Sequence, residues 1–307
     1  MKKILVATDK PFAKIAIELI KGIVTEAGHE LVLLEKYTTP EQLIEAASKA
    51  NAMIVRSDLI TAQVVETAKD LKIVVRAGAG YDNLDLTACS SKGIVAMNTP
   101  GQNANAVAEL AFGMMVMMAR NNYNGTSGNE LRGKSIGIHA YGNVGMYVAK
   151  IAKGFGMEVY AFDPFVKAEK MVADGVKPVA TVEELYKTCQ YISLHIPATE
   201  STKKSINYNL LSLMPKGAVL INTARKEVIN EEELVKLMKD RADFRYISDI
   251  EPGNKDVFTA ELAGRFFFTP KKSGAQTEEA NVNAGVAAAR QIVSFFKTGD
   301  ETYRVNK

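Results

Sequence analysis

A glycine-containing turn near the middle of the chain has the residue types and spacing that hold phosphate groups. Residues 137–145 read GIHAYGNVG, directly after a predicted strand and directly before the helical pattern MYVAKIAKGFG. Gly142 lets the backbone approach a pyrophosphate, Gly145 allows close helix packing, and the helix N-terminus favours negative charge. Ala140 replaces the first glycine of the usual pattern. We therefore predict a dinucleotide-binding turn that carries one extra methyl group.

An acidic residue follows this turn at the distance that a dinucleotide site requires. Asp163 stands at the end of the predicted strand EVYAFD, about 20 residues after the glycines. A carboxylate at this place accepts hydrogen bonds from the adenosine ribose, which favours NAD over NADP. A strand-end turn before Pro164 is the alternative explanation for the same aspartate.

Three charged residues follow later apolar runs, where the strands of a parallel sheet would end and bind ligands. Arg225 follows AVLINTA, Glu251 follows FRYISDI, and Lys272 follows FFFTP closely. A bidentate arginine can fix a carboxylate and polarise a carbon–oxygen bond. A lysine can exchange a proton with the hydroxyl oxygen while a dinucleotide carries the hydride. These residue types suit the interconversion of a 2-hydroxy acid and a 2-keto acid.

The protonation state of the lysine sets the easier direction of this reaction. An ordinary lysine has a pKa near ~10.4, so at neutral pH it donates a proton and favours reduction of the keto acid. Desolvation and the cations Arg225 and Lys271 would lower the pKa of Lys272, whereas Glu251 would raise it. We expect the oxidative direction to have an alkaline optimum.

The elements that must position these residues follow from the hydrophobic pattern. Short β-branched runs alternate with amphipathic stretches, which predicts βαβ units and parallel sheets covered by helices on both faces. A Met-rich apolar helix over residues 105–120 separates two such series, and an apolar helix over residues 278–296 precedes a polar tail. The length of 307 residues is sufficient for two domains. The predicted fold class is therefore α/β, with two doubly wound parallel-sheet domains.

Composition argues against several functional classes. The 38 Lys and Arg residues nearly balance the 35 Asp and Glu residues, and the chain has no basic arm that would bind nucleic acid. The longest apolar run, residues 110–119, is about half of what a membrane span needs. Cys89 and Cys189 have no CxxC or His-rich context, so we predict no bound metal. The N-terminus lacks a secretory signal, and we expect a cytoplasmic protein.

These segments, together with RAGAGYDNLDL and NTPGQNANAVAEL, resemble the D-2-hydroxyacid dehydrogenase family over residues 54–285. Within that family the chain is most similar to the short, lysine-type D-3-phosphoglycerate dehydrogenases. The resemblance implies a Rossmann NAD-binding domain over residues 100–276, inserted in a flavodoxin-like substrate domain of residues 1–99 plus 277–307, with the active site in the cleft between them. It also implies a homodimer through the apolar helix, and no C-terminal regulatory domain.

The resemblance assigns roles residue by residue. Arg225 takes the arginine role of the family's NTARG motif. Glu251 takes the glutamate role, which implies that it orients the Lys272 ammonium. Lys272, or alternatively Lys271, replaces the histidine of TPHIG. The implied cofactor-binding residues are Tyr141, Gly142, Asn143, Val144, Gly145, Asp163, His195, Ile196, Pro197, Thr223, Ala224 and Asp249. The implied substrate-binding residues are Arg56, Ser57, Ala79, Gly80, Asn103, Arg225 and Lys271. For Arg56 and His195, a purely structural role is the alternative.

The implied substrate is a phosphorylated 2-hydroxy acid, and the implied reaction is NAD-dependent oxidation of D-3-phosphoglycerate. Reduction of glyoxylate or hydroxypyruvate is the alternative enzyme function, and a non-catalytic NAD-binding partner protein is the alternative of another class. The segment between Arg120 and Gly133 is shorter than is usual in the family and lacks its aromatic and basic residues. We therefore expect Arg132, Lys134 or a neighbouring subunit to supply the cation that binds the phosphate.

Overall fold

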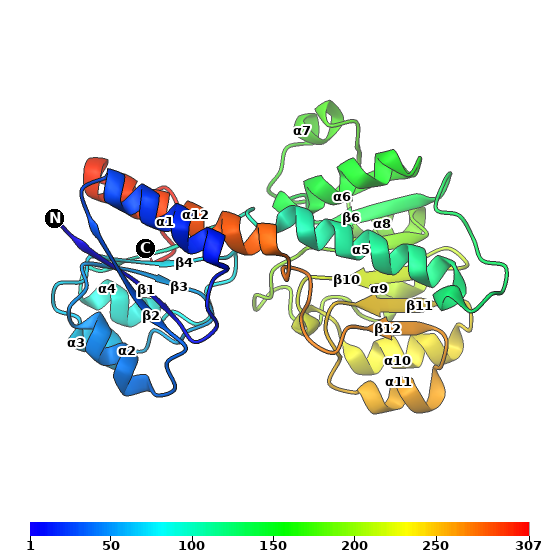
Figure 1. The fold of residues 1–307 in the computed structure, drawn as a ribbon. Helices are drawn as coiled ribbons and strands as arrows, with labels where there is room; N and C mark the ends of the chain where they lie inside the picture. The colour runs from blue at the N-terminus through cyan, green and yellow to red at the C-terminus, as the bar shows by residue number, and fades with distance from the viewer. Residues whose placement is uncertain (307) are drawn as a thin grey trace. The chain divides into compact units, whose positions relative to one another are not determined.

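The computed structural model describes residues 1–306, which form two compact units (Figure 1). One unit comprises Met1–Asn103 and the C-terminal segment that begins at Gln276, and the other comprises Ala104–Ala275. A parallel sheet of five strands forms the centre of the first unit, and one of seven strands forms the centre of the second. The predicted α/β fold class, with two doubly wound sheets, is confirmed.

The five-stranded sheet of the first unit has the order β2-β1-β3-β4-β5, which is the flavodoxin-like order. Its strands are β1 (Lys3–Thr8), β2 (Glu30–Glu35), β3 (Ala52–Val55), β4 (Ile73–Arg76) and β5 (Val95–Asn98). Helices cover both faces, as the continuous apolar runs require. One face carries α1 (Lys14–Glu26) and α12 (Glu278–Thr298), and the other carries α2 (Pro40–Ala47), α3 (Ala62–Thr67) and α4 (Leu86–Ser91) (Figure 1).

The residues after α12 lie along the β5 edge of this sheet. The Val305 N–H donates to Ala96 O at 2.8 Å, and Asn306 Oδ1 accepts from the Ala96 N–H at 2.8 Å. The Asn306 amide also donates to Ile94 O at 2.8 Å, and the residue is 2% exposed. A buried asparagine therefore fixes a segment that the sequence pattern identifies only as a polar tail.

The seven-stranded sheet of the second unit has the order β12-β11-β10-β9-β6-β7-β8. Its strands are β6 (Ser135–His139), β7 (Glu158–Phe162), β8 (Lys177–Pro178), β9 (Tyr191–Leu194), β10 (Val219–Asn222), β11 (Arg245–Ser248) and β12 (Phe266–Phe268). One apolar cluster contains residues of α5 (Ala104–Ala119), α6 (Asn143–Gly154) and α7 (Ala168–Ala173). The other contains residues of α8 (Val182–Thr188), α9 (Tyr208–Ser212), α10 (Glu231–Asp240) and α11 (Lys255–Glu261).

The Met-rich stretch forms α5, within one residue of its predicted limits, and it packs beside α6 (Figure 1). Met115 and Met118 are buried in the core of the second unit. A single 3-10 turn, η1 (Asn121–Tyr123), follows α5. Among residues 1–306, no helix combines the length and the apolar content that a membrane span needs.

The chain order reverses between β6 and β9, which are neighbours in the sheet. Such a reversal opens a crevice at the carboxyl ends of the strands, where dinucleotides bind in doubly wound folds. The register places His139 at the end of β6 opposite Leu194 of β9, and Asn222 at the end of β10 opposite Ser248 of β11. The segments that follow six of these strands therefore lie together at the carboxyl end of the sheet. They are the segments after β6, β7, β9, β10, β11 and β12.

Candidate active site

The glycine turn after β6 has the backbone that its sequence predicts, with strain at one residue. Ala140 adopts a φ of 78°, in the left-handed region, and its N–H donates to Phe162 O at 2.9 Å. A methyl group on Gly145 would lie 2.4 Å from Ala140 O, so the start of α6 can pack this closely only on a glycine. A methyl group on Gly142 would meet no atom within 4 Å. The backbone at Gly142 therefore faces open space, as a phosphate cradle must.

Asp163 connects this turn to the end of β7. Its Oδ2 accepts from the Tyr141 N–H at 2.7 Å, and its Oδ1 accepts from the N–H groups of Phe165 at 2.8 Å and Val166 at 3.1 Å. The strand-end turn that is the alternative explanation of Asp163 is thus present. The same carboxylate also fixes the glycine turn, because it binds the backbone N–H of Tyr141 within that turn. The role of Asp163 toward a ribose stays a prediction.

Two histidines stand where β6 and β9 end. The His195 ring lies 2.9 Å from Ser193 Oγ, and the His139 ring lies 3.2 Å from the Tyr186 hydroxyl. Desolvation lowers the pKa of His195 to about 3 and that of His139 to about 4. Both rings are therefore neutral at neutral pH. These contacts fit the structural alternative for His195, and its role in cofactor binding stays a prediction.

Lys272 follows β12 and reaches the ends of β10 and β11. Its Nζ donates to Ala224 O at 2.8 Å and to Asp249 Oδ1 at 3.1 Å, and Thr223 O lies 3.5 Å away. Desolvation is the largest influence and lowers the pKa of Lys272, the adjacent Asp249 opposes it, and the positive charge of Arg225 adds to the lowering. The side chain remains partly exposed, so a reacting group can approach the ammonium.

The carboxylate beside Lys272 is not the one that the sequence indicates. Asp249 is 1% exposed and pairs with Lys272, whereas Glu251 pairs with Lys255 at 2.5 Å in the described structure. The expected contact between Glu251 and the Lys272 ammonium is therefore wrong in this structure. The physical reason is that Glu251 precedes α11 and lies four residues from a lysine, so an ion pair within the segment is available. Any other catalytic role of Glu251 stays a prediction.

Arg225 lies directly after the β10 loop and is half-buried. The Asn222 side chain holds that loop, since its Nδ2 donates to Arg225 O at 3.0 Å and its Oδ1 accepts from the Ala224 N–H at 3.0 Å. Lys271 is exposed, and its carbonyl oxygen accepts from the hydroxyl of Thr269 at 2.7 Å. Of the two candidate lysines, the structure brings Lys272 to Ala224 and Asp249 and leaves Lys271 on the surface.

A dinucleotide fits the edge of the sheet that carries these residues. The buried Thr223 Oγ1, at the end of β10, has no hydrogen-bond partner among the described residues, so it can bind a polar group of a ligand. The space over Gly142 is open at the other end of the same edge. The remaining predicted cofactor residues follow the carboxyl ends of these strands: Asn143, Val144 and Gly145 in the first turn of α6, Ile196 and Pro197 after β9, and Ala224 after β10.

Two of the predicted substrate-binding residues of the first unit make contacts that belong to its fold. Arg56 Nη1 donates to Lys10 O at 2.9 Å, Nη2 donates to Asn281 Oδ1 at 2.7 Å, and the guanidinium lies 5.3 Å from the centre of the Phe12 ring. These contacts fit the structural alternative for Arg56, and its role in substrate binding stays a prediction. Ala79 O accepts from the Asn98 amide at 2.6 Å. Ser57 is exposed, and Gly80 and Asn103 are partly exposed.

Arg76 is not among the predicted site residues, and it lies against the glycine loop of the first unit. A methyl group on Gly78 would fall 1.5 Å from Arg76 Nη1, and Gly78 has a φ of 154°. Arg76 Nε donates to Arg56 O at 3.1 Å. In the motif RAGAG, the absence of a side chain at Gly78 leaves room for the Arg76 guanidinium. The arginine directly before the glycines is the sequence signal that could have identified Arg76.

The predicted source of a phosphate-binding cation within the second unit is wrong. Arg132 and Lys134 precede β6, whereas the turn, Asp249 and Lys272 follow the carboxyl ends of their strands. In a parallel sheet these positions lie at opposite edges. Arg132 packs beside Gly156, where a methyl group would lie 3.3 Å from its Cγ. A neighbouring subunit remains the open alternative.

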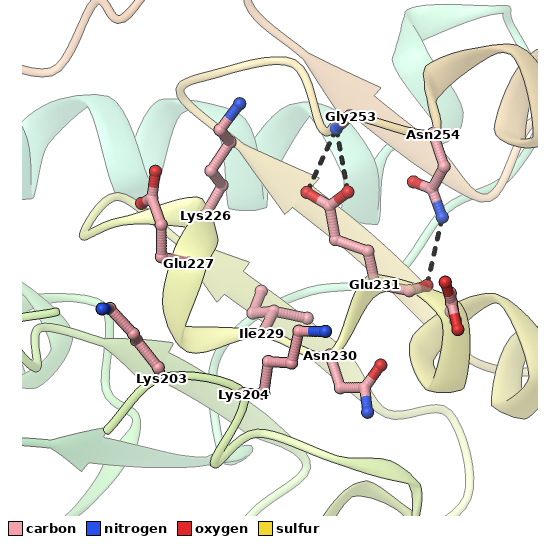
Figure 2. Close-up of a pocket in the computed structure, with 10 residues that line it drawn as sticks. Lys203, Lys204, Lys226, Glu227, Ile229, Asn230, Glu231, Gly253 and Asn254 are labelled. Atoms are coloured by element: carbon pink, nitrogen blue, oxygen red, sulfur yellow. Dashed lines mark hydrogen bonds between the residues drawn. The ribbon is translucent and has the colours of Figure 1, made fainter. Parts of the chain in front are cut away.

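A cavity of about 520 Å³ lies beside the loop that follows Arg225 (Figure 2). Three lysines line it, Lys203, Lys204 and Lys226, and so do the acidic residues Glu227, Glu231 and Glu232. The Gly253 N–H donates to the Glu231 carboxylate at 2.9 Å (Figure 2). Because the positive and negative side chains balance, the lining does not favour an anion. Among residues 1–306, no group of three His, Cys, Asp or Glu side chains could hold a metal ion.

Comparison with known proteins gives the chain its relatives. Residues 105–262 match the family model described as D-isomer specific 2-hydroxyacid dehydrogenase, NAD binding domain. Hydroxypyruvate reductase of Thermotoga maritima is 32% identical, with 95% of this chain and 98% of the reductase covered. D-3-phosphoglycerate dehydrogenase of Methanocaldococcus jannaschii is 34% identical over 89% of this chain, which spans 57% of that enzyme's length. The NAD+-bound 3-phosphoglycerate dehydrogenase of Entamoeba histolytica superimposes with a TM-score of 0.89 and 48% identity, covering 100% of this chain and 99% of that one.

Proposed function

The chain belongs to the D-isomer specific 2-hydroxyacid dehydrogenase family, and from this membership we propose that it interconverts D-3-phosphoglycerate and 3-phosphohydroxypyruvate with NAD, the first step of serine synthesis. The observation that carries the proposal is Lys272, placed among the strand ends of the nucleotide-binding sheet with Asp249 beside it. The similarity to the amoebal enzyme over the whole chain supports the phosphorylated substrate.

Each polar group of the site has a task in this reaction. Arg225 binds the substrate carboxylate and draws electron density from the reacting oxygen, as a guanidinium does well. Bound NADH would supply the hydride that reduces the keto carbon. Lys272 gives a proton from its Nζ to the carbonyl oxygen during reduction and takes the hydroxyl proton back during oxidation.

The lowered pKa of Lys272 determines how the two directions respond to pH. Oxidation needs the neutral amine, so its rate rises as pH increases through the pKa of Lys272. Reduction needs the ammonium, so its rate falls over the same range. Because desolvation lowers that pKa, the crossover lies below the value of an ordinary lysine.

The test is the initial rate of NADH oxidation with 3-phosphohydroxypyruvate, hydroxypyruvate and glyoxylate. We expect a strong preference for the phosphorylated keto acid and the loss of most of this rate in Lys272→Ala. Lys239→Ala is the matched control, because Lys239 pairs with Glu261 on the surface and keeps the rate. No turnover of any of the three acids, despite NADH binding, would indicate a non-catalytic NAD-binding protein instead.

Hydroxypyruvate reduction is the second candidate function. It is favoured by the Thermotoga maritima relative, which matches this chain over nearly the full length of both proteins. The same assay separates the two candidates. Equal or higher kcat/KM for hydroxypyruvate than for its phosphorylated form would select the reductase.

We also propose a homodimer that uses the outer face of α5 and α6. Gly113 on α5 is exposed, and Tyr147 and Phe155 are 39% and 41% exposed on and just after α6. Phe155 stacks on Phe112 of α5, with ring centres 5.1 Å apart. Light scattering coupled to gel filtration tests the dimer, and Tyr147→Glu should shift it toward the monomer mass.

A further inference from the structure

The ammonium of Lys272 lies in a shell of acceptors that leaves little freedom of position. Two backbone oxygens, Ala224 O at 2.8 Å and Thr223 O at 3.5 Å, belong to the loop after β10, and Asp249 Oδ1 at 3.1 Å belongs to the end of β11. The carbonyl groups are neutral. Asp249 is therefore the full negative charge in direct contact with this ammonium.

Asp249 is held at least as firmly as the lysine. Its Oδ2 accepts from the Gly274 N–H at 2.9 Å, and its backbone N–H donates to Asn222 O at 3.2 Å. A methyl group on Gly274 would lie 2.7 Å from Asp249 Oδ2, so a glycine is required there for the contact. One oxygen of the carboxylate is fixed by the chain that carries Lys272, and the other faces the ammonium.

Glu251 is engaged elsewhere. Its carboxylate binds Lys255 at 2.5 Å, and both side chains are partly exposed at the start of α11. A surface ion pair of this kind is worth little and would break easily. Asp249, in contrast, is buried, and it accepts hydrogen bonds from the N–H groups of Ser273 and Gly274, directly after Lys272.

We propose that Asp249 is the positioning carboxylate of the proton-transfer lysine, and that it performs the task that the sequence pattern gives to Glu251. The proposal rests on the proposed function, because it assigns a role within the same reaction. Asp249 acts through Lys272 and does not itself exchange a proton with the substrate.

The step that Asp249 supports balances in protons and electrons. During reduction the keto carbon gains a hydride with its electron pair, and the carbonyl oxygen takes one proton from Lys272 Nζ. The lysine is left as a neutral amine, and Asp249 stays ionised. Recovery of a proton from solvent through the exposed part of Lys272 restores the ammonium.

The charges around Lys272 set the sign of the effect. Asp249 and Glu227 stabilise the ammonium and raise its pKa, while desolvation and Arg225 lower it. Removing the charge of Asp249 must therefore lower the pKa of Lys272 further. The rate of reduction therefore begins to fall at a lower pH, and the rate of oxidation begins to rise at a lower pH.

The experiment compares the pH profiles of reduction for the wild-type protein and two isosteric variants, Asp249→Asn and Glu251→Gln. We expect Asp249→Asn to lose about 10-fold or more in kcat and to shift the alkaline limb down by roughly one pH unit. Glu261→Gln, on the surface of α11, is the control and keeps the wild-type profile. An unshifted limb in Asp249→Asn, or a shifted limb in Glu251→Gln alone, would overturn the proposal.

Two further measurements keep the test decisive. If Asp249→Asn does not fold, Gly274→Ala displaces the same carboxylate without changing its charge and should shift the limb in the same direction. Trace acetylation of Lys272 across pH, quantified by mass spectrometry, reports its titration without any substrate. A lower titration point in Asp249→Asn supports the pairing even where no keto acid is turned over, and in that case the proposed function fails while the pairing stands.

Discussion

Two regions at the carboxyl end of the seven-stranded sheet, the β6 and β7 end and the β10 to β12 end, are built in different ways. At the β6 and β7 end, the backbone around Ala140, Gly142 and Gly145 forms the nucleotide turn. Asp163 binds N–H groups that are nearby in sequence. At the β10 to β12 end, side chains from three loops, Arg225, Asp249 and Lys272, determine the chemistry. Backbone geometry is thus specified by nearby residues, whereas the partner of a charged side chain depends on the tertiary fold.

Removal of the lysine should separate the two ends most clearly. Lys272→Met should lower kcat by about 10²- to 10⁴-fold, because it removes the proton donor. Stopped-flow titration of NADH fluorescence should give an unchanged Kd, because the nucleotide turn is intact. A matching loss of NADH affinity would mean that the ends act as one unit and that the comparison is false.

A methyl group added at the nucleotide turn should instead lower the stability of the protein and its affinity for NADH. Gly145→Ala places Cβ 2.4 Å from Ala140 O, and overpacking of this kind costs about 1 to 3 kcal/mol in the free energy of unfolding. Urea titration measures the loss, and NADH affinity should fall with it. Gly142→Ala is the control for stability, because its Cβ meets no atom within 4 Å. Equal destabilisation by both substitutions would contradict the close packing at Gly145.

Lowering the pH should reduce the free energy of unfolding, because two desolvated histidines lie where β6 and β9 end. His139 and His195 have folded pKa values of about 4 and about 3, below the ordinary value of 6.5, so the unfolded chain binds protons first as pH falls. Their stabilising effect is complete above pH 6.5 and is lost progressively below it, by about 1 to 2 kcal/mol each between pH 7 and pH 5. Urea midpoints measured across this range should fall, and His195→Gln should flatten the slope.

The smallest expected effect is a gain at the nucleotide turn. Ala140 has a φ of 78°, a conformation that costs an alanine roughly 1 to 2 kcal/mol and a glycine almost nothing. Ala140→Gly should stabilise the protein by about 0.5 to 1 kcal/mol, since the greater freedom of glycine in the unfolded chain offsets part of the relief. Thermal or urea unfolding measures the change. A loss of stability would show that the methyl group makes packing contacts worth more than the strain.

Much of the fold can be predicted from the apolar pattern. The helices expected over residues 105–120 and 278–296 occur at Ala104–Ala119 and Glu278–Thr298, because their periodicity extends over several turns. The two-residue strand β8 and the segment at Asn306 could not be predicted, because each is defined by hydrogen bonds to a distant strand.

The parallel sheets, the glycine turn and the positions of Arg225, Glu251 and Lys272 after strand ends follow from the sequence, because these depend on local residue order and periodicity. Only the tertiary structure decided which carboxylate meets the lysine and that Arg132 and Lys134 lie at the wrong edge for a phosphate site. The reason is physical. Glu251 and Asp249 are two residues apart and chemically alike, so the choice between them depends on burial and on the Gly274 N–H, which lies far along the chain.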